Sequence, residues 1–125
     1  MWKPATPGLR VRPLSGTHDR ANFSCGVASL DAYFHTYAGQ DVKRKANAVF
    51  VLVAADEPQR VLGYFTLCAT ALGQGEVPEA ARKHVPRYPL VSATLIGRLA
   101  ICKNRQGEGL GAALLAEALR KAGFR

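Results

Sequence analysis

One feature constrains this chain more than any other: a glycine-rich turn joins an apolar stretch to an amphipathic one close to the C-terminal end. The turn reads Gln106-Gly107-Glu108-Gly109-Leu110-Gly111. An apolar stretch over residues 90–101, interrupted by Gly97, precedes it, and residues 109–122 carry leucines at helical spacing. We therefore predict a strand, a glycine turn and a helix in direct succession, with a helix face formed by Leu110, Leu114, Leu115 and Leu119 turned toward the core.

This succession predicts a phosphate-binding site. The first backbone N–H groups of a helix have no partner within the helix, and the helix dipole adds partial positive charge there. Glycines at 107, 109 and 111 lack a Cβ, so a phosphate can approach the backbone closely. We expect residues 106–112 to hold the phosphate and the side chain of Glu108 to point to solvent.

Several classes of phosphate ligand bind to glycine turns. A Walker loop ends in Gly-Lys-Ser or Gly-Lys-Thr, whereas this turn continues Gly109-Leu110-Gly111-Ala112. A dinucleotide fingerprint follows the first strand of a βαβ unit and needs an acidic residue about 20 positions later, but this turn lies almost at the end of the sequence. What remains is Gln106-x-x-Gly109-x-Gly111, directly after Leu99-Ala100-Ile101.

The rest of the sequence predicts a single α/β domain over residues 1–125, since a chain of this length builds one core. We expect an edge strand over residues 9–14 and a helix over 29–42 that Ser29 caps and that buries one face, formed by Leu30, Tyr33, Phe34 and Tyr37. Strands over 48–54 and 60–70 should pair as a hairpin. We predict an irregular loop over residues 73–89, and its length is typical of loops that bind a ligand or partner.

Taken together, these pieces resemble the GCN5-related N-acetyltransferase (GNAT) family, and within it the acetyltransferase toxins of bacterial toxin–antitoxin pairs. The resemblance covers most of the chain. It is carried by Phe23-Ser24-Cys25-Gly26, Leu30-Asp31-Ala32-Tyr33-Phe34, Val61-Leu62-Gly63-Tyr64-Phe65-Thr66-Leu67, Tyr88-Pro89, Gly97-Arg98-Leu99-Ala100-Ile101 and the glycine turn. It implies a mixed, mostly antiparallel sheet flanked by helices.

The resemblance also implies a cofactor and partners. Acetyl-CoA would be the cosubstrate, with its pantetheine arm on the backbone of Leu99 and Ile101 and its pyrophosphate on residues 106–112, which include Gln106, Gly107, Gly109, Gly111 and Ala112. The toxins of this family acetylate the amino group of an aminoacyl-tRNA and are held by a ribbon-helix-helix antitoxin. Both are therefore expected partners.

The net charge of +8 and a pI near 9.9 agree with a polyanionic partner. Charge alone specifies no partner, so a solvated basic surface is the alternative interpretation. The cations that we place near a tRNA backbone are Lys43, Arg44, Lys45, Arg82, Lys83, Arg87 and Arg98. Arg98 is the strongest of these candidates because it adjoins the strand expected to hold the cofactor.

The sequence departs from the family after the glycine turn. The family fold continues with further strands and a helix that carries a tyrosine, which protonates the leaving thiolate, whereas this sequence stops at Arg125. We therefore expect a C-terminally truncated fold. Tyr33, Tyr37, Tyr64 and Tyr88 precede the motif, so the catalytic residue stays unassigned. A sheet edge left open beside the cofactor strand favours self-association as a homodimer.

Other chemistries find little support. The three histidines and the scattered Cys25, Cys68 and Cys102 lack metal-ligand spacing, so no metal site is expected and we interpret the cysteines as buried reduced thiols. Neither an apolar stretch of the roughly 20 residues that span a bilayer nor a signal peptide is recognisable, which favours a cytoplasmic protein.

Three hypotheses stay open. The first is an aminoacyl-tRNA N-acetyltransferase toxin. The second is an acetyltransferase that acts on a small amine or a protein N-terminus, whose activity would need no tRNA and would depend little on salt. The third is a non-catalytic remnant that binds coenzyme A or an antitoxin.

Overall fold

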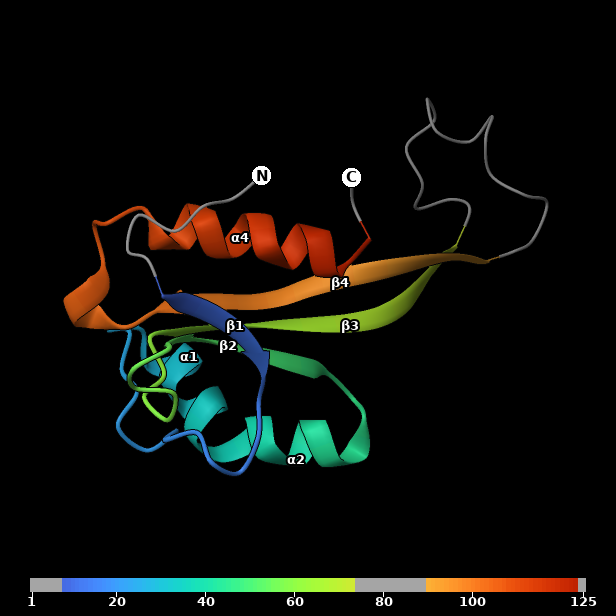
Figure 1. Ribbon diagram of the computed structural model, residues 1–125. Coiled ribbons are helices and arrows are strands. Elements are labelled where there is room, and N and C mark those ends of the chain that lie inside the picture. Colours follow the sequence, from blue (N-terminus) through green and yellow to red (C-terminus); the bar gives the residue numbers. More distant parts are fainter. Residues whose placement is uncertain (1–7, 74–89, 124–125) are drawn as a thin grey trace.

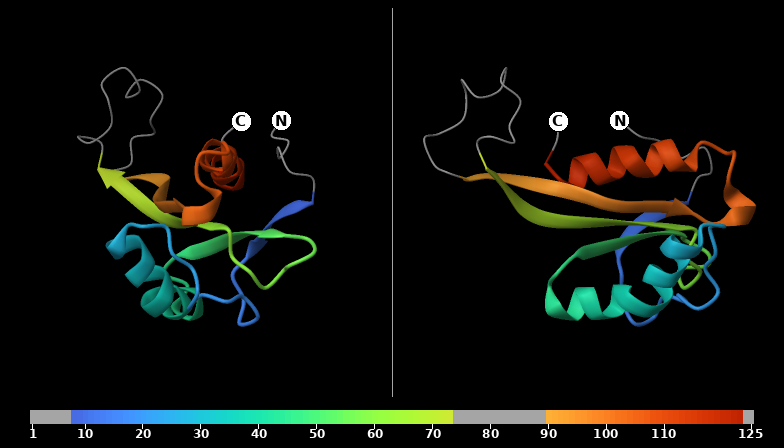
Figure 2. Two further views of the ribbon diagram at one scale, coloured as in Figure 1. Left: turned by 90° about the vertical axis from the view of Figure 1, so that its left-hand side faces the viewer. Right: turned by 180° about the vertical axis from the view of Figure 1, so that it is seen from behind.

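The computed structural model describes residues 8–73 and 90–123. They form a four-stranded sheet in the order β1-β2-β3-β4, in which every neighbouring pair is antiparallel. The strands are β1 (Leu9–Pro13), β2 (Ala48–Ala54), β3 (Gly63–Gly73) and β4 (Leu90–Ile101). Helical segments cover both faces of this sheet, as Figure 1 and Figure 2 show. The predicted antiparallel sheet flanked by helices is confirmed.

A single helical segment covers one face of the sheet. It consists of α1 (Ala28–Ala32), a π-helical turn η1 (Tyr33–Tyr37) and α2 (Ala38–Arg44). Its N-cap is Val27, so the prediction that Ser29 caps it is wrong. Tyr33 and Phe34 are buried as predicted, but Tyr37 is 54% exposed. In the π turn the Ala38 N–H donates to Tyr33 O, and the added backbone per turn brings Ala38 into the buried position instead.

Helix α4 (Leu110–Lys121) covers the opposite face. Leu110, Leu114 and Ala118 are buried and Leu119 is partly buried, but Leu115 is 44% exposed, so its predicted place in the core is wrong. Each residue turns the helix by about 100°. Leu115 therefore points away from the narrow stripe that Leu110, Leu114 and Ala118 form. No helix of the described residues is long and apolar enough to cross a membrane.

Aromatic side chains fill the core beneath α1 and η1. The rings of Phe34 and Tyr64 stack with their centroids 4.4 Å apart, and Phe23 meets both rings edge-on. The Tyr64 hydroxyl donates to Leu30 O at 2.7 Å, which satisfies its buried polar end. This cluster holds the helical segment on the sheet.

The two long strands β3 and β4 pair with each other, and β4 leads toward the glycine turn. Strand β3 begins at Gly63 rather than Arg60, because residues 55–62 make the turn out of β2. Its register with β4 shifts between Thr66 and Leu67, so Gly97 is the extra residue of a β-bulge. A Cβ at Gly97 would lie 3.0 Å from Thr66 Oγ1, which explains a glycine at this point of the strand.

We expect Gly63→Ala to lower the free energy of unfolding by about 1–3 kcal/mol, the usual cost of an extra methyl group in a packed core. A Cβ there would lie 2.7 Å from Ile101 Cδ1 and 2.9 Å from Ala100 O. Gly16→Ala is the control, because a Cβ at Gly16 meets nothing within 4 Å. Urea unfolding followed by circular dichroism measures both variants. Equal stabilities would contradict the close packing of β3, β4 and α4.

Candidate functional site

The end of strand β4 turns its backbone groups outward. The Cys102 N–H donates to Leu62 O at 2.9 Å, so the preceding carbonyl of Ile101 points away from β3. Successive residues of a strand direct their backbone groups to alternate sides. Leu99 and Ile101 therefore present their N–H and C=O groups at the outer edge of β4, which no other described strand covers. These are the two residues on which the family resemblance places the pantetheine arm.

The glycine turn follows through a short 3-10 helix, η3 (Lys103–Arg105). Gly107 and Gly109 have φ angles of +82° and +80°, a left-handed conformation that favours glycine. A Cβ at Gly107, Gly109 or Gly111 would meet no protein atom within 4 Å. The space in front of the turn is thus open, which fits a ligand that approaches the backbone.

Helix α4 opens directly at this turn. Its first turn carries no acidic residue and its N-cap Gly109 supplies no side-chain cap. The Ala113 N–H donates to Gly109 O at 3.2 Å, so the N–H groups of Leu110, Gly111 and Ala112 lie ahead of the first helical hydrogen bond. Together with the helix dipole, they make the N-terminus of this 12-residue helix chemically suited to an anion.

The acidic residue inside the turn is neutralised. Glu108 is exposed, as predicted, and both of its carboxylate oxygens accept from Arg105 Nε, at 3.0 and 3.1 Å. This ion pair offsets the negative charge that Glu108 would otherwise present to an anion.

The side chain of Gln106 anchors the turn and does not serve as a wall of the phosphate site. Its Nε2 donates to Ile101 O at 2.9 Å and to Cys25 O at 2.8 Å. The Cys25 N–H in turn donates to Asp31 Oδ1 of α1 at 2.8 Å. The turn, the end of β4 and the start of α1 are therefore joined by one chain of hydrogen bonds. The sequence pointed to Gln106 as a phosphate-turn residue but gave no sign of this link.

A polar cluster lies on the face of β4 that is turned away from α4. The Arg98 guanidinium carbon lies 3.7 Å from the centroid of the Tyr33 ring. The Tyr33 hydroxyl donates to Asp41 Oδ2 at 2.7 Å, and Asn47 Nδ2 donates to the same oxygen at 2.7 Å. Burial, followed by the contact with Asp41, raises the pKa of Tyr33 to about 12, so its hydroxyl stays a donor at neutral pH.

Three of the other predicted cations lie together at the C-terminal end of α2. Lys43 and Arg44 lie exposed in the last turn of α2, and Lys45 follows in a left-handed conformation with φ +57°. Cations at a helix C-terminus also stabilise the helix dipole, so these three have a structural role as well. Arg82, Lys83 and Arg87 lie outside the described residues.

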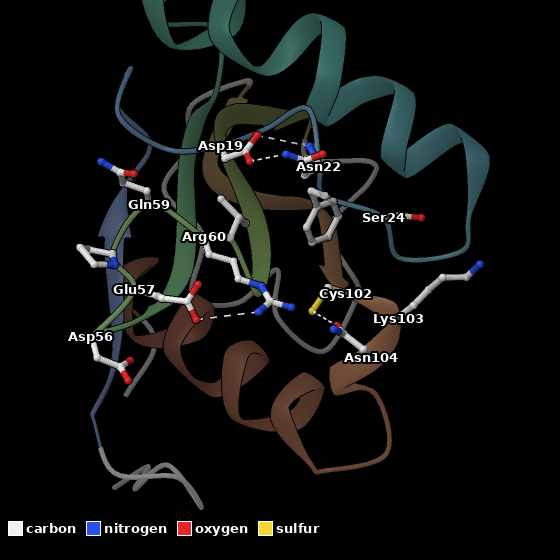
Figure 3. Close-up of a pocket in the computed structure, with 13 residues that line it drawn as sticks. Asp19, Asn22, Ser24, Asp56, Glu57, Gln59, Arg60, Cys102, Lys103 and Asn104 are labelled. Atoms are coloured by element: carbon white, nitrogen blue, oxygen red, sulfur yellow. Dashed lines mark hydrogen bonds and ion pairs between the residues drawn. The ribbon is translucent and has the colours of Figure 1, made fainter.

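A cavity of about 820 Å³ lies at the end of the sheet (Figure 3). It is lined by parts of residues 19–24, 56–61 and 102–104, and not by the glycine turn. Cys102 is buried here and its Sγ donates to Asn104 Oδ1 at 3.1 Å. Burial raises the pKa of the Cys102 thiol, which makes it a poor nucleophile and fits the packing role expected for it. No group of metal-ligating side chains occurs among residues 8–73 and 90–123.

Comparisons with known proteins agree with this geometry. No protein-family model matches the chain. A tRNA-acetylating toxin of Mycobacterium tuberculosis is 31% identical over 108 residues, covering 86% of this chain and 62% of the relative. A probable toxin, TacT, of Sinorhizobium fredii is 26% identical over 112 residues, covering 89% of this chain and 61% of the relative.

Solved structures of toxins superpose closely. A tyrosine-to-phenylalanine mutant of KacT matches with a TM-score of 0.81 and 28% identity, covering 92% of this chain and 69% of that one. AtaT complexed with acetyl-methionyl-tRNAfMet matches with a TM-score of 0.80 and 28% identity, covering 90% and 68%. In sequence and in fold, this chain is similar to the GNAT toxins. A mutant AtaT bound to the C-terminus of its antitoxin AtaR and acetyl-CoA gives 0.72 and 26%, covering 92% and 66%.

The match covers only part of each GNAT toxin. The chain spans about three fifths of the length of the curated relatives that it matches.

We expect Gln106→Met to lower the free energy of unfolding by about 1–2 kcal/mol, because it removes two hydrogen bonds worth about 1 kcal/mol each. Amide hydrogen exchange should rise at Cys25 and in α1, because Gln106 Nε2 donates to Cys25 O and the Cys25 N–H donates to Asp31 Oδ1. Arg105→Gln is the control and should cost at most about 1 kcal/mol, because it removes only a partly exposed ion pair. Exchange that rises in the turn alone would contradict the link to α1.

Proposed function

We propose that this chain acts as an N-acetyltransferase that transfers acetyl from acetyl-CoA to the amino group of an aminoacyl-tRNA. The observation that carries the proposal is the outward-facing backbone of Leu99 and Ile101, which leads directly into the open glycine turn and the N-terminus of α4. An extended arm ending in a pyrophosphate fits this succession. The names of the similar toxins and the AtaT complexes with acetyl-CoA and with acetyl-methionyl-tRNAfMet support it.

Each part of the site has a separate task toward acetyl-CoA. Backbone N–H groups between Gly107 and Ala112 would hold the pyrophosphate, while Gln106 keeps the turn in place through its side chain. The backbone of Leu99 and the N–H of Ile101 would hold the pantetheine arm as an added strand would be held, since Ile101 O already accepts from Gln106 Nε2. The coenzyme supplies an activated thioester, and the chain orients it for attack by an amine. The group that protonates the leaving thiolate stays unassigned.

The acceptor and partner proposals rest on charge and on the similar toxins. The net charge of +8 attracts a polyanion, and Lys43, Arg44, Lys45 and Arg98 are the described cations proposed for tRNA. Arg82, Lys83 and Arg87 belong to the same proposal on sequence alone. We further propose a single domain, homodimerisation and a ribbon-helix-helix antitoxin as partner. A cytoplasmic location follows from the acceptor, because aminoacyl-tRNA is a cytoplasmic substrate.

The cofactor site is tested by placing a charge in the turn. We expect calorimetry to show micromolar binding of acetyl-CoA to the chain, and Gly109→Asp to weaken it at least about tenfold through repulsion of the phosphates. Gly109→Asn is the matched control, since it has the same size and tolerates the left-handed conformation without a charge. Equal affinities of the two variants, or no binding by the parent chain, would count against the site.

The acceptor is tested by salt dependence. We expect acetylation of bulk aminoacyl-tRNA, measured with radiolabelled acetyl-CoA, to fall steeply with salt. Replacing Lys43, Arg44 and Lys45 together with glutamine should flatten the plot of log affinity against log salt by about 1 for each phosphate that the variant no longer binds. Arg120→Gln on α4 is the control because Arg120 pairs with Glu117. Acetylation of small amines without salt sensitivity would favour the second hypothesis.

A further inference from the structure

We propose that Arg98 recognises the phosphodiester next to the aminoacylated 3′-terminal adenosine of the acceptor. This inference rests on the proposed function and assigns the group that selects an acceptor whose amine lies beside an anionic group. It starts from the cluster of Arg98, Tyr33, Asp41 and Asn47, which the cofactor site does not use.

The position of Arg98 on β4 places its charge on the acceptor side. Ile101 packs toward α4, because a Cβ at Gly63 would touch both Ile101 Cδ1 and Leu114 Cδ2. Side chains alternate along a strand, so Arg98 extends from the opposite face, where it meets Tyr33. It directly precedes Leu99, whose backbone would hold the cofactor near its reactive end. The phosphate turn and the Arg98 side chain thus serve different faces of the same strand.

The guanidinium has a rigid support. It lies 3.7 Å from the centroid of the Tyr33 ring, and that ring belongs to the π-helical turn, where Tyr33 is only 6% exposed. Hydrogen bonds from Tyr33 and Asn47 fix Asp41 at the hydroxyl end of the ring. Contact with a ring occupies the face of a guanidinium and leaves its in-plane N–H donors available for the two oxygens of a phosphate.

The charge around Arg98 favours an anion. Arg98 and Arg44 both help to lower the pKa of Asp41, after the larger effects of Tyr33 and Asn47, so both cations lie near this carboxylate. Asp41 already accepts two hydrogen bonds on Oδ2, and it forms no ion pair with Arg98 within the described residues. Two cations beside one carboxylate leave a net positive site. Such a site repels polyamines and attracts an amine that carries a phosphate beside it.

The test compares two RNA hairpins that mimic an acceptor stem and end in a hydrolysis-resistant 3′-aminoacylamido-adenosine. One has a normal terminal phosphodiester and the other a neutral methylphosphonate at that linkage. We expect the chain to bind the phosphodiester hairpin about tenfold more tightly by fluorescence anisotropy, and Arg98→Gln to abolish that preference. Arg98→Lys should keep part of it, because a lysine retains the charge but lacks the paired donors. Urea unfolding of each variant confirms that it is folded.

The outcomes separate this inference from the proposed function. If Arg98→Gln remains folded and keeps the tenfold preference, or if the parent chain binds both hairpins equally, Arg98 does not recognise this phosphate while tRNA binding stands. If the parent chain binds acetyl-CoA but neither hairpin, the proposed acceptor is wrong and the inference falls with it. A drop in affinity for both hairpins alike in Arg98→Gln would show a general electrostatic role and would also overturn the proposal.

Discussion

The hydrogen bond from Gln106 Nε2 to Ile101 O is the interaction on which the site geometry depends. Strand β4 ends where this carbonyl turns away from β3, and a carbonyl at an open strand end needs a donor. Gln106 supplies that donor from the far side of the η3 turn, so the turn must fold back beside the strand. The same amide nitrogen also donates to Cys25 O, which brings the loop before α1 to the same point. One side chain thus fixes the distance between the outer strand, the glycine turn and the helical segment on the other face.

Local patterns of apolar residues and glycines in the sequence explain most strands and helices around this turn. Continuous apolar residues predicted strand β2 with its observed bounds, and the succession of strand, glycines and spaced leucines predicted β4 and α4. The wrong predictions for Tyr37 and Leu115 have their cause in how the helices pack on the sheet. Tyr37 fits a regular helical face, but the π turn brings Ala38 to the sheet, and no residue pattern announces that turn. Leu115 follows a leucine in sequence, yet only a narrow stripe of α4 meets the two long strands.

In the candidate site, the residues were predictable from the sequence but their side-chain contacts were not. The spacing of Gly107, Gly109 and Gly111 indicates a cradle because the missing side chains are visible in the sequence itself. Leu99 and Ile101 came from the resemblance, and the alternation of backbone groups gives a physical reason for them. The contacts of Gln106, Asp31 and Asp41 were not predictable, since each joins residues from different elements. Asp31 lies within a matching segment, but a match of that kind says nothing of which atoms it contacts.

If both proposed sites bind their anions, the sheet separates two ways of doing so. On the side of α4, peptide N–H groups and a helix dipole act without any cationic side chain, and Arg105 serves only to neutralise Glu108. On the side of η1, a guanidinium supported by an aromatic ring is the charged group. Backbone groups cannot move apart without unfolding the turn, whereas an arginine needs a support to keep one orientation. The buried Tyr33, fixed by Asp41 and Asn47, supplies that support, so the polar cluster and the glycine turn solve the same electrostatic problem by different means.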